Sequence, residues 1–333
     1  MNQKYFLVLT CFLLASSSFG QATQFKIITQ DVNNFWEAVD SLKTAKDTVK
    51  VFQNLVIDRA SAAFQVFIKK WNIKAVNYAY QIKRYPQFYQ TLRERSHFLT
   101  HSADSIRKMV ARFEKLYPNI NQADICVGFG NFSTGGNIAI ENGRNLVYIG
   151  LEYHGLDTTT YLKELSTSTQ DYASRSNFFR TIVHELVHIQ QRTHGQKTAS
   201  TFGGNLLANR ILSEGIADFI AKLIVPQGNN GNYYGYGLKN EAGLILKLKD
   251  ELYKVGSGDW FGGNDSLFID KPRDLGYFMG SRIGRNYYTV HKLQNNNLTA
   301  LIEIKNLEKF INESQYFSGL QTNANAYFKR HGF

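Results

Sequence analysis

The segment HELVH at residues 184–188 constrains the fold of this chain more than any other feature. Residues 177–194 contain neither Gly nor Pro before position 195, and their apolar residues recur at helical spacing, so the sequence predicts one helix there. On a helix, positions i and i+4 lie about 40° apart and one turn along the axis. The imidazoles of His184 and His188 can therefore reach the same metal ion. Glu185 is rotated by about 100° and borders the site without needing to bind the ion.

Two histidines need a third ligand before they indicate a catalytic metal. Glu214 lies 26 residues after His188, on a second predicted helix that ends at about Val225, before Pro226. It would complete a set of two His and one Glu that leaves one position open, the arrangement of catalytic zinc. Asp218 follows at i+4 on the same face, and we expect it to hydrogen-bond the far nitrogen of a ligand imidazole.

His194 is the alternative third ligand. It follows His188 by six residues, which matches the spacing His-Glu-x-x-His-x-x-Gly-x-x-His. Position 191 is Gln where that pattern has Gly, so the helix should continue and turn His194 by about 240° from His188. This difference favours Glu214.

The motif His-Glu-x-x-His followed by Glu-x-x-x-Asp resembles that of the gluzincin, thermolysin-like metallopeptidases. The segments HELVHIQQ and LSEGIADFIA are similar to uncharacterised bacterial families of predicted zinc-dependent proteases. The resemblance covers about residues 125–290 and does not extend to residues 21–118. It implies one zinc ion per chain, held by His184, His188 and Glu214, with Glu185 as the catalytic base.

Such peptidases usually carry a Tyr or His that stabilises the oxyanion of the tetrahedral intermediate. Tyr277, in Tyr-Phe-Met-Gly, is similar to the Tyr-x-x-Gly of gluzincin aminopeptidases, and His291 is the alternative donor. Residues 135–139 and the strand they begin would form a sheet edge along which a peptide backbone pairs. The tyrosines within 233–236 are expected on a loop that borders the substrate cleft.

The pattern along the chain predicts an α+β fold that is mainly helical. Helices are expected over about residues 31–118, and a small mixed sheet over 125–153, where Gly-rich turns separate short apolar runs. Residues 165–176, 227–237 and 256–265 are expected as connectors or loops, and the remainder as helices. We therefore expect a helical N-terminal region at 21–120 and a zincin-like metallopeptidase domain at 121–333.

Residues 1–20 have the pattern of a signal peptide. Lys4 provides a positive start, residues 5–15 form an apolar run, and small residues stand at the −3 and −1 positions of a cut before Gln21. The run is shorter than the ~20 residues that span a bilayer. The sequence thus predicts a secreted or periplasmic protein with no transmembrane segment after cleavage. Cleavage would also leave Cys126 as the one cysteine, so no internal disulfide is expected.

Charge limits the expected partners. The chain has 38 Lys and Arg against 27 Asp and Glu, but no basic run exceeds two residues, so no nucleic-acid partner is expected. The sequence favours an exported zinc metallohydrolase that cleaves a peptide or protein substrate. Alternatives are a non-catalytic, zinc-containing binding protein of the cell envelope, and a basic protein that docks on anionic envelope polymers. The oligomeric state stays open.

Overall fold

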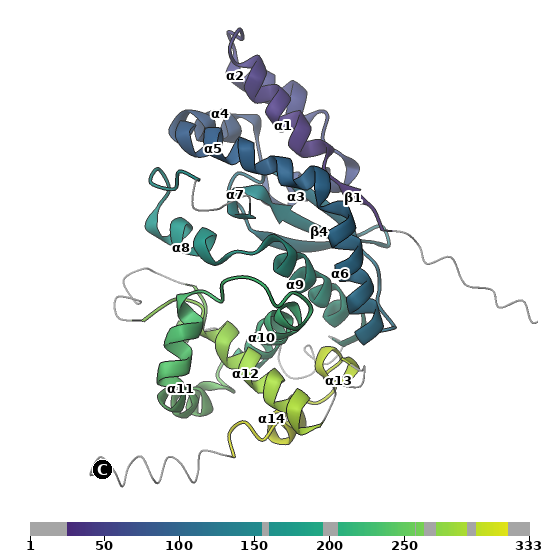
Figure 1. The fold of residues 1–333 in the computed structure, drawn as a ribbon, viewed down its shortest axis with the longest axis vertical. Helices are drawn as coiled ribbons and strands as arrows, with labels where there is room; N and C mark the ends of the chain where they lie inside the picture. Colours follow the sequence, from purple (N-terminus) through teal and green to yellow (C-terminus); the bar gives the residue numbers. More distant parts are fainter. Residues whose placement is uncertain are drawn as a thin grey trace, which may run out of the picture.

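A four-stranded mixed sheet lies in the middle of the molecule, between helices from both halves of the sequence (Figure 1). The computed structural model describes residues 25–154, 160–195, 206–256, 258–262, 271–291 and 298–318. The strand order is β1-β2-β4-β3, with β1, β2 and β4 parallel and β3 antiparallel to β4. The strands are β1 (Ile27–Ile28), β2 (Asp124–Gly128), β3 (Gly136–Glu141) and β4 (Arg144–Gly150). Among the strands that the structure describes, β3 is therefore at an edge of the sheet.

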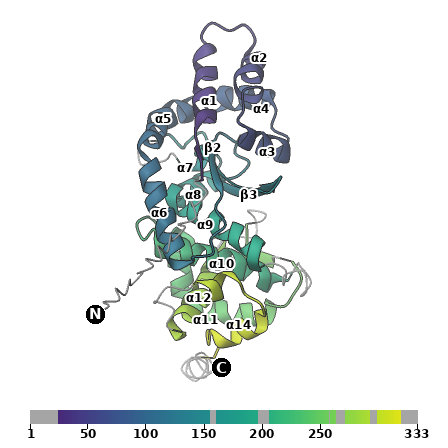
Figure 2. The ribbon, with the colours of Figure 1, turned by 90° about the vertical axis from the view of Figure 1, so that its right-hand side faces the viewer.

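The two faces of the sheet carry different cores because side chains alternate along each strand. Helix α3 (Ala62–Trp71) covers one face, where Phe64 stacks on Tyr148 and Cys126 is buried. Helix α9 (Phe178–Gln190) packs against β3 and β4 on the other face. Figure 2 shows α3 and α9 on opposite sides of the sheet. The central strands thus lie between two helical layers.

Helices make up most of the rest of the described chain and confirm the predicted α+β, mainly helical class. Those at the N-terminal end are α1 (Gln30–Ser41), α2 (Thr48–Phe52), a π turn (Gln53–Ile57), α4 (Ala75–Arg84), α5 (Pro86–Ser96), a 3-10 turn (His97–His101) and α6 (Ala103–Leu116). Those after the sheet are α7 (Leu151–His154), α8 (Thr167–Arg175), α9, a π turn (Gln191–Gly195), α10 (Leu207–Ile224), α11 (Asn232–Glu251), a 3-10 turn (Gly258–Trp260), α12 (Leu275–Val290), α13 (Thr299–Ile302) and α14 (Leu307–Glu313).

One hydrophobic core runs through both predicted regions of the chain. It extends from Val32 in α1 to Tyr316 near the end of the described residues. Strand β1 pairs with β2, and Phe35 of α1 stacks on Phe129 with ring centroids 4.0 Å apart. The boundary expected near residue 120 therefore does not separate two cores.

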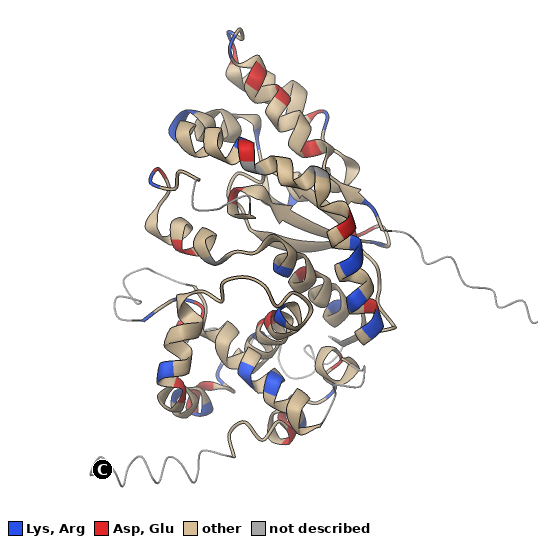
Figure 3. Ribbon diagram, viewed as in Figure 1, with Lys and Arg blue, Asp and Glu red and all other residues tan. Residues whose placement is uncertain are grey.

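Charged residues are spread along the whole molecule. Figure 3 shows Lys and Arg interleaved with Asp and Glu, with an evident basic group on α6. Within the described ranges, we find no helix with the length and apolar character that crossing a bilayer requires.

Two loop predictions are wrong. Residues 165–176 include helix α8, whose first turn is capped by the Ser166 hydroxyl. The segment 227–237 includes the start of α11, so its tyrosines lie on a helix. Glycine disfavours a helix by about 1 kcal/mol, but Gly237 lets α11 approach the Phe278 ring, and this tertiary contact outweighs the local preference. The predicted signal peptide at 1–20 lies outside the described residues.

Helices α10 and α12 cross with their backbones in contact. A Cβ atom added at Gly280 would lie 1.9 Å from the Ile211 carbonyl oxygen, and one at Gly215 would lie 2.2 Å from the Gly280 backbone. Only glycine permits this approach. Because Gly215 adjoins Glu214 and Gly280 lies one turn after Tyr277, the crossing sets the position of both candidate site residues.

We expect Gly280→Ala to lower the free energy of unfolding by about 1–3 kcal/mol or more, because the added methyl group forces the two backbones apart. Gly243→Ala on α11 is the matched control, since a Cβ there meets nothing within 4 Å. Ala should stabilise this helical position by about 0.5–1 kcal/mol. Chemical denaturation measures both. Equal stability of Gly280→Ala and wild type would contradict the close approach.

The turn that leads into β3 is held by two buried groups of α7. Asn131 and Phe132 have positive φ angles of 55° and 57°, and the Phe132 amide donates to Glu152 Oε1 at 3.1 Å. His154 Nε2 donates to the Gly135 carbonyl at 2.9 Å. Burial raises the pKa of Glu152 to about 7, although hydrogen bonds from backbone amides act to lower it. Burial also lowers the pKa of His154 to about 4.

The Glu152 pKa predicts a definite pH dependence. In the unfolded chain the carboxyl ionises above pH 4.5, its ordinary pKa. In the folded chain it ionises only above about pH 7. Its contribution to stability is therefore complete below pH 4.5 and is lost as the pH rises through 7. The wild-type free energy of unfolding should fall by about 3 kcal/mol relative to that of Glu152→Gln across this window. Denaturation across the pH range measures this, with the exposed Glu308→Gln as control; parallel curves for wild type and Glu152→Gln would refute it.

Candidate metal centre

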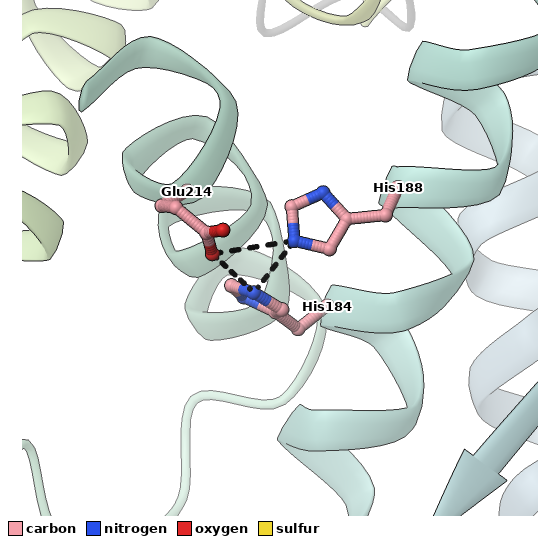
Figure 4. A group of neighbouring side chains, drawn as sticks. All are labelled: His184, His188 and Glu214. Carbon is pink, nitrogen blue, oxygen red and sulfur yellow. Dashed lines mark hydrogen bonds and ion pairs between the residues drawn. The ribbon is translucent and has the colours of Figure 1, made fainter. Parts of the chain in front are cut away.

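Helix α9 is fixed in rotation by the sheet on one side and by a capped N-terminus. The Asn177 side chain accepts a hydrogen bond from the Arg180 amide at 3.0 Å, as expected for an N-cap residue. The apolar side chains of α9 are buried in the main core: Ile182, Val183, Leu186 and Ile189. His184 and His188 therefore point away from these residues and toward α10 (Figure 4).

The structure brings His184, His188 and Glu214 together. The Nε2 atoms of His184 and His188 are 3.0 Å apart. Glu214 Oε2 lies 3.2 Å from His184 Nε2 and 3.3 Å from His188 Nε2. All three side chains are largely buried, with 15%, 16% and 23% of their side-chain surface exposed. Figure 4 shows that Glu214 reaches the pair from α10, the neighbouring helix.

These three donor atoms fit the ligand shell of a tetrahedral metal ion. Ligand bonds of 2.0–2.1 Å to zinc place the ligand atoms about 3.3–3.4 Å from one another. The three distances of 3.0, 3.2 and 3.3 Å are close to these values. Two imidazole nitrogens and one carboxylate are also donors that zinc and neighbouring transition metals accept.

The electrostatics of the cluster favour positive charge among these three side chains. Burial by itself would raise the pKa of Glu214, but the two imidazoles hold it well below its ordinary value. For His188, burial opposes the charged form, yet the Glu214 carboxylate raises the pKa to about 9. Glu214 thus stays ionised and needs a cationic partner.

Gln191 fixes the orientation of His188, a role that the sequence analysis missed. His188 Nδ1 donates to Gln191 Oε1 at 2.8 Å, and the Gln191 amide donates to the Ser213 carbonyl at 3.1 Å. With Nδ1 protonated, neutral His188 presents the lone pair of Nε2 to the centre of the cluster. The available signal was a hydrogen-bonding side chain at i+3 from His188, one turn further along the same helix.

Glu185 borders the cluster but does not belong to it. It lines the same cleft as the two histidines and is 8% exposed. Strand β3 presses against it: a Cβ added at Gly136 would lie 2.5 Å from Glu185 Oε1. Burial raises the pKa of Glu185, and the charges of His188 and His184 oppose this.

Tyr277 lines the same cleft beside the cluster. Its ring centroid is 6.0 Å from that of His184, and both residues line a cleft of about 490 Å³. Burial raises the pKa of its hydroxyl well above the ordinary value, and the Glu214 charge adds to this. Tyr233 also lines the cleft, from α11 and not from the loop that was expected.

The expected role of Asp218 is wrong. Within the described chain it forms no hydrogen bond to either imidazole: Lys222 Nζ donates to its Oδ2 at 2.7 Å, and the Tyr233 hydroxyl donates to its Oδ1 at 3.4 Å. The reason is that Lys222, one turn further along α10, offers a nearby opposite charge.

The two alternative residues lie away from the cluster. The helix continues through the π turn after α9, so His194 is turned toward Asn121 and Tyr117. His291, the alternative oxyanion donor, directly follows α12 and is exposed to solvent. Its ring stacks on that of Tyr287, with centroids 4.1 Å apart. It is 14 residues after Tyr277, about 21 Å along the helix.

No protein-family model matches this chain, and searches of curated proteins and of solved structures find no similar protein.

We expect Gln191→Ala to weaken zinc binding by about 10- to 100-fold, because His188 loses the hydrogen bond that orients it. Asp218→Asn is the matched comparison and should change the affinity much less, since Asp218 contacts Lys222. Competition with a chromophoric chelator measures both affinities. A larger loss in Asp218→Asn than in Gln191→Ala would reverse the assignment.

Proposed function

We propose that this protein is an exported, zinc-dependent peptidase of the gluzincin kind. The convergence of His184, His188 and Glu214, with Glu185 buried beside them and not bound to them, is the observation that carries the proposal. Three protein ligands and a carboxylate beside them that does not bind the metal are typical of a catalytic zinc site. A structural zinc ion usually has four protein ligands. Export is inferred from the pattern of residues 1–20.

Glu185 acts as the general base and then as the general acid. When bound, zinc polarises a carbonyl group and lowers the pKa of a water molecule from about 16 toward 7. Glu185 accepts the proton of the attacking water on its carboxylate and donates it to the nitrogen of the leaving amine. Burial supports this exchange because it raises the carboxyl pKa toward the working pH.

Tyr277 donates a hydrogen bond to the oxyanion that develops on the scissile carbonyl. Its high pKa keeps the hydroxyl protonated, so that it remains a donor at neutral pH. Gln191 takes the positioning role that had been expected of Asp218.

The edge strand favours a polypeptide substrate over other carboxyl derivatives. Gly136, Asn137 and Ile138 of β3 line the cleft beside Glu185, and no other described strand pairs with the outer side of β3. An extended peptide can pair with such an edge and bring its backbone past the base.

We expect Glu185→Gln to keep one zinc per chain while peptide cleavage falls by about 10²- to 10⁴-fold, because the proton acceptor is lost and the ligands are intact. Metal analysis gives the zinc content, and mass spectrometry of a peptide pool gives the cleavage. The exposed Glu308→Gln is the matched control and should behave as wild type.

The outcome also separates the alternatives. Cleavage that survives in Glu185→Gln would remove its assigned role. The non-catalytic binding protein would be favoured if the wild type holds one zinc ion per chain and retains a partner tightly but cleaves no peptide.

A further inference from the structure

Lys70 of α3 closes the free edge of β3 beside the cleft. Its Nζ donates to Asn137 Oδ1 at 2.6 Å and to the Ile138 carbonyl at 3.0 Å. Asn137 Oδ1 also accepts from the Ile138 amide at 2.9 Å. Both backbone groups of Ile138 that a pairing peptide would use are thus occupied by side chains of the protein itself.

Arg192 brings a second cation to the same end of the cleft. It follows His188 by one turn and lines the cleft together with Asn137 and Ile138. Its side chain is exposed and has no hydrogen-bond or ion-pair partner among the residues that the structure describes. Burial lowers the pKa of the Lys70 ammonium, and the charge of Arg192 lowers it further, whereas Glu185 raises it. Lys70 holds Asn137 and Ile138, which line the cleft together with Arg192 and Glu185, so both cations lie at this end of the cleft.

The other cations of the cleft are already engaged. Lys222 is paired with Asp218 at 2.7 Å. Arg180 is 9% exposed and donates hydrogen bonds to oxygen atoms of the segment 225–230. Of the Lys and Arg residues that line the cleft in the described chain, Arg192 at the β3 end is thus the one without such a partner.

We propose that Lys70 and Arg192 together bind a carboxylate of the peptide substrate, next to the bond that is cut. A carboxylate accepts stronger hydrogen bonds from an ammonium and a guanidinium than a neutral carbonyl does. It draws Lys70 from the Ile138 carbonyl, which then becomes free to pair with the peptide backbone. An acidic peptide thereby gains access to the Ile138 carbonyl, which Lys70 otherwise occupies.

This inference rests on the proposed function for its substrate class, and its test measures binding instead of turnover. The probe is a pool of fluorescent hexapeptides with one Glu at varied positions, compared with the same pool carrying Gln. Each pool is prepared with a free and with an amidated C-terminus. Zinc-loaded Glu185→Gln protein holds the peptides uncleaved, and fluorescence anisotropy gives the dissociation constants.

We expect carboxylate-bearing peptides to bind about tenfold or more tightly than their amide counterparts, with the preference shrinking as salt is added. Lys70→Met and Arg192→Met, each in the Glu185→Gln background, should reduce this ratio toward one. Lys69→Met removes the same charge from the adjacent position of α3 and should keep the ratio. The free and amidated pools show whether the side chain or the C-terminus supplies the carboxylate.

Equal binding of the Glu, Gln and amidated pools would overturn the inference, as would a preference that survives in both Met variants. Either result is independent of whether wild-type protein cleaves the peptides. Absence of cleavage with the carboxylate preference intact would instead count against the proposed function alone.

Discussion

The buried carboxylate of Glu214 between two imidazoles links the two helices on which the site depends. A carboxylate that loses water at this depth needs positive charge nearby, because desolvation of an unpaired ion costs several kcal/mol. The positive charge can come from the imidazoles of α9 or from a bound cation. In either case, α9 and α10 must face each other where His184, His188 and Glu214 meet. The sheet holds α9 from behind, so the position of α10 decides whether the three donors converge.

Glycine residues make the required approaches possible. Gly215 and Gly280 bring α10 and α12 into backbone contact, which positions Glu214 and Tyr277 beside His184. At Gly136, the absence of a side chain lets β3 lie directly against the Glu185 carboxylate. The proposed ligands, base and oxyanion donor thus come from three helices, α9, α10 and α12, and the close approaches at these glycines help to set their spacing.

Several features followed from local sequence because their causes are local. The spacing of His184 and His188 places both imidazoles on one face of any helix. Pro118 and Pro226 end α6 and α10 two residues earlier, at Leu116 and Ile224, as their sterics require. The β3–β4 hairpin was also predictable, since its two runs of apolar residues flank a turn with positive φ at Asn142 and Gly143.

The remaining features depend on residues far apart in the sequence. Sequence spacing suggested Glu214 as a ligand, but only the packing of α10 on α9 brings its carboxylate within 3.3 Å of both imidazoles. The helical start of α11 and the pairing of Lys70 with β3 likewise arise from tertiary contacts. By itself, the sequence determined which residues share a helix face, because helix periodicity fixes that relation. The tertiary structure decided which faces meet, because this depends on the fit of whole helices and on the charges they bury together.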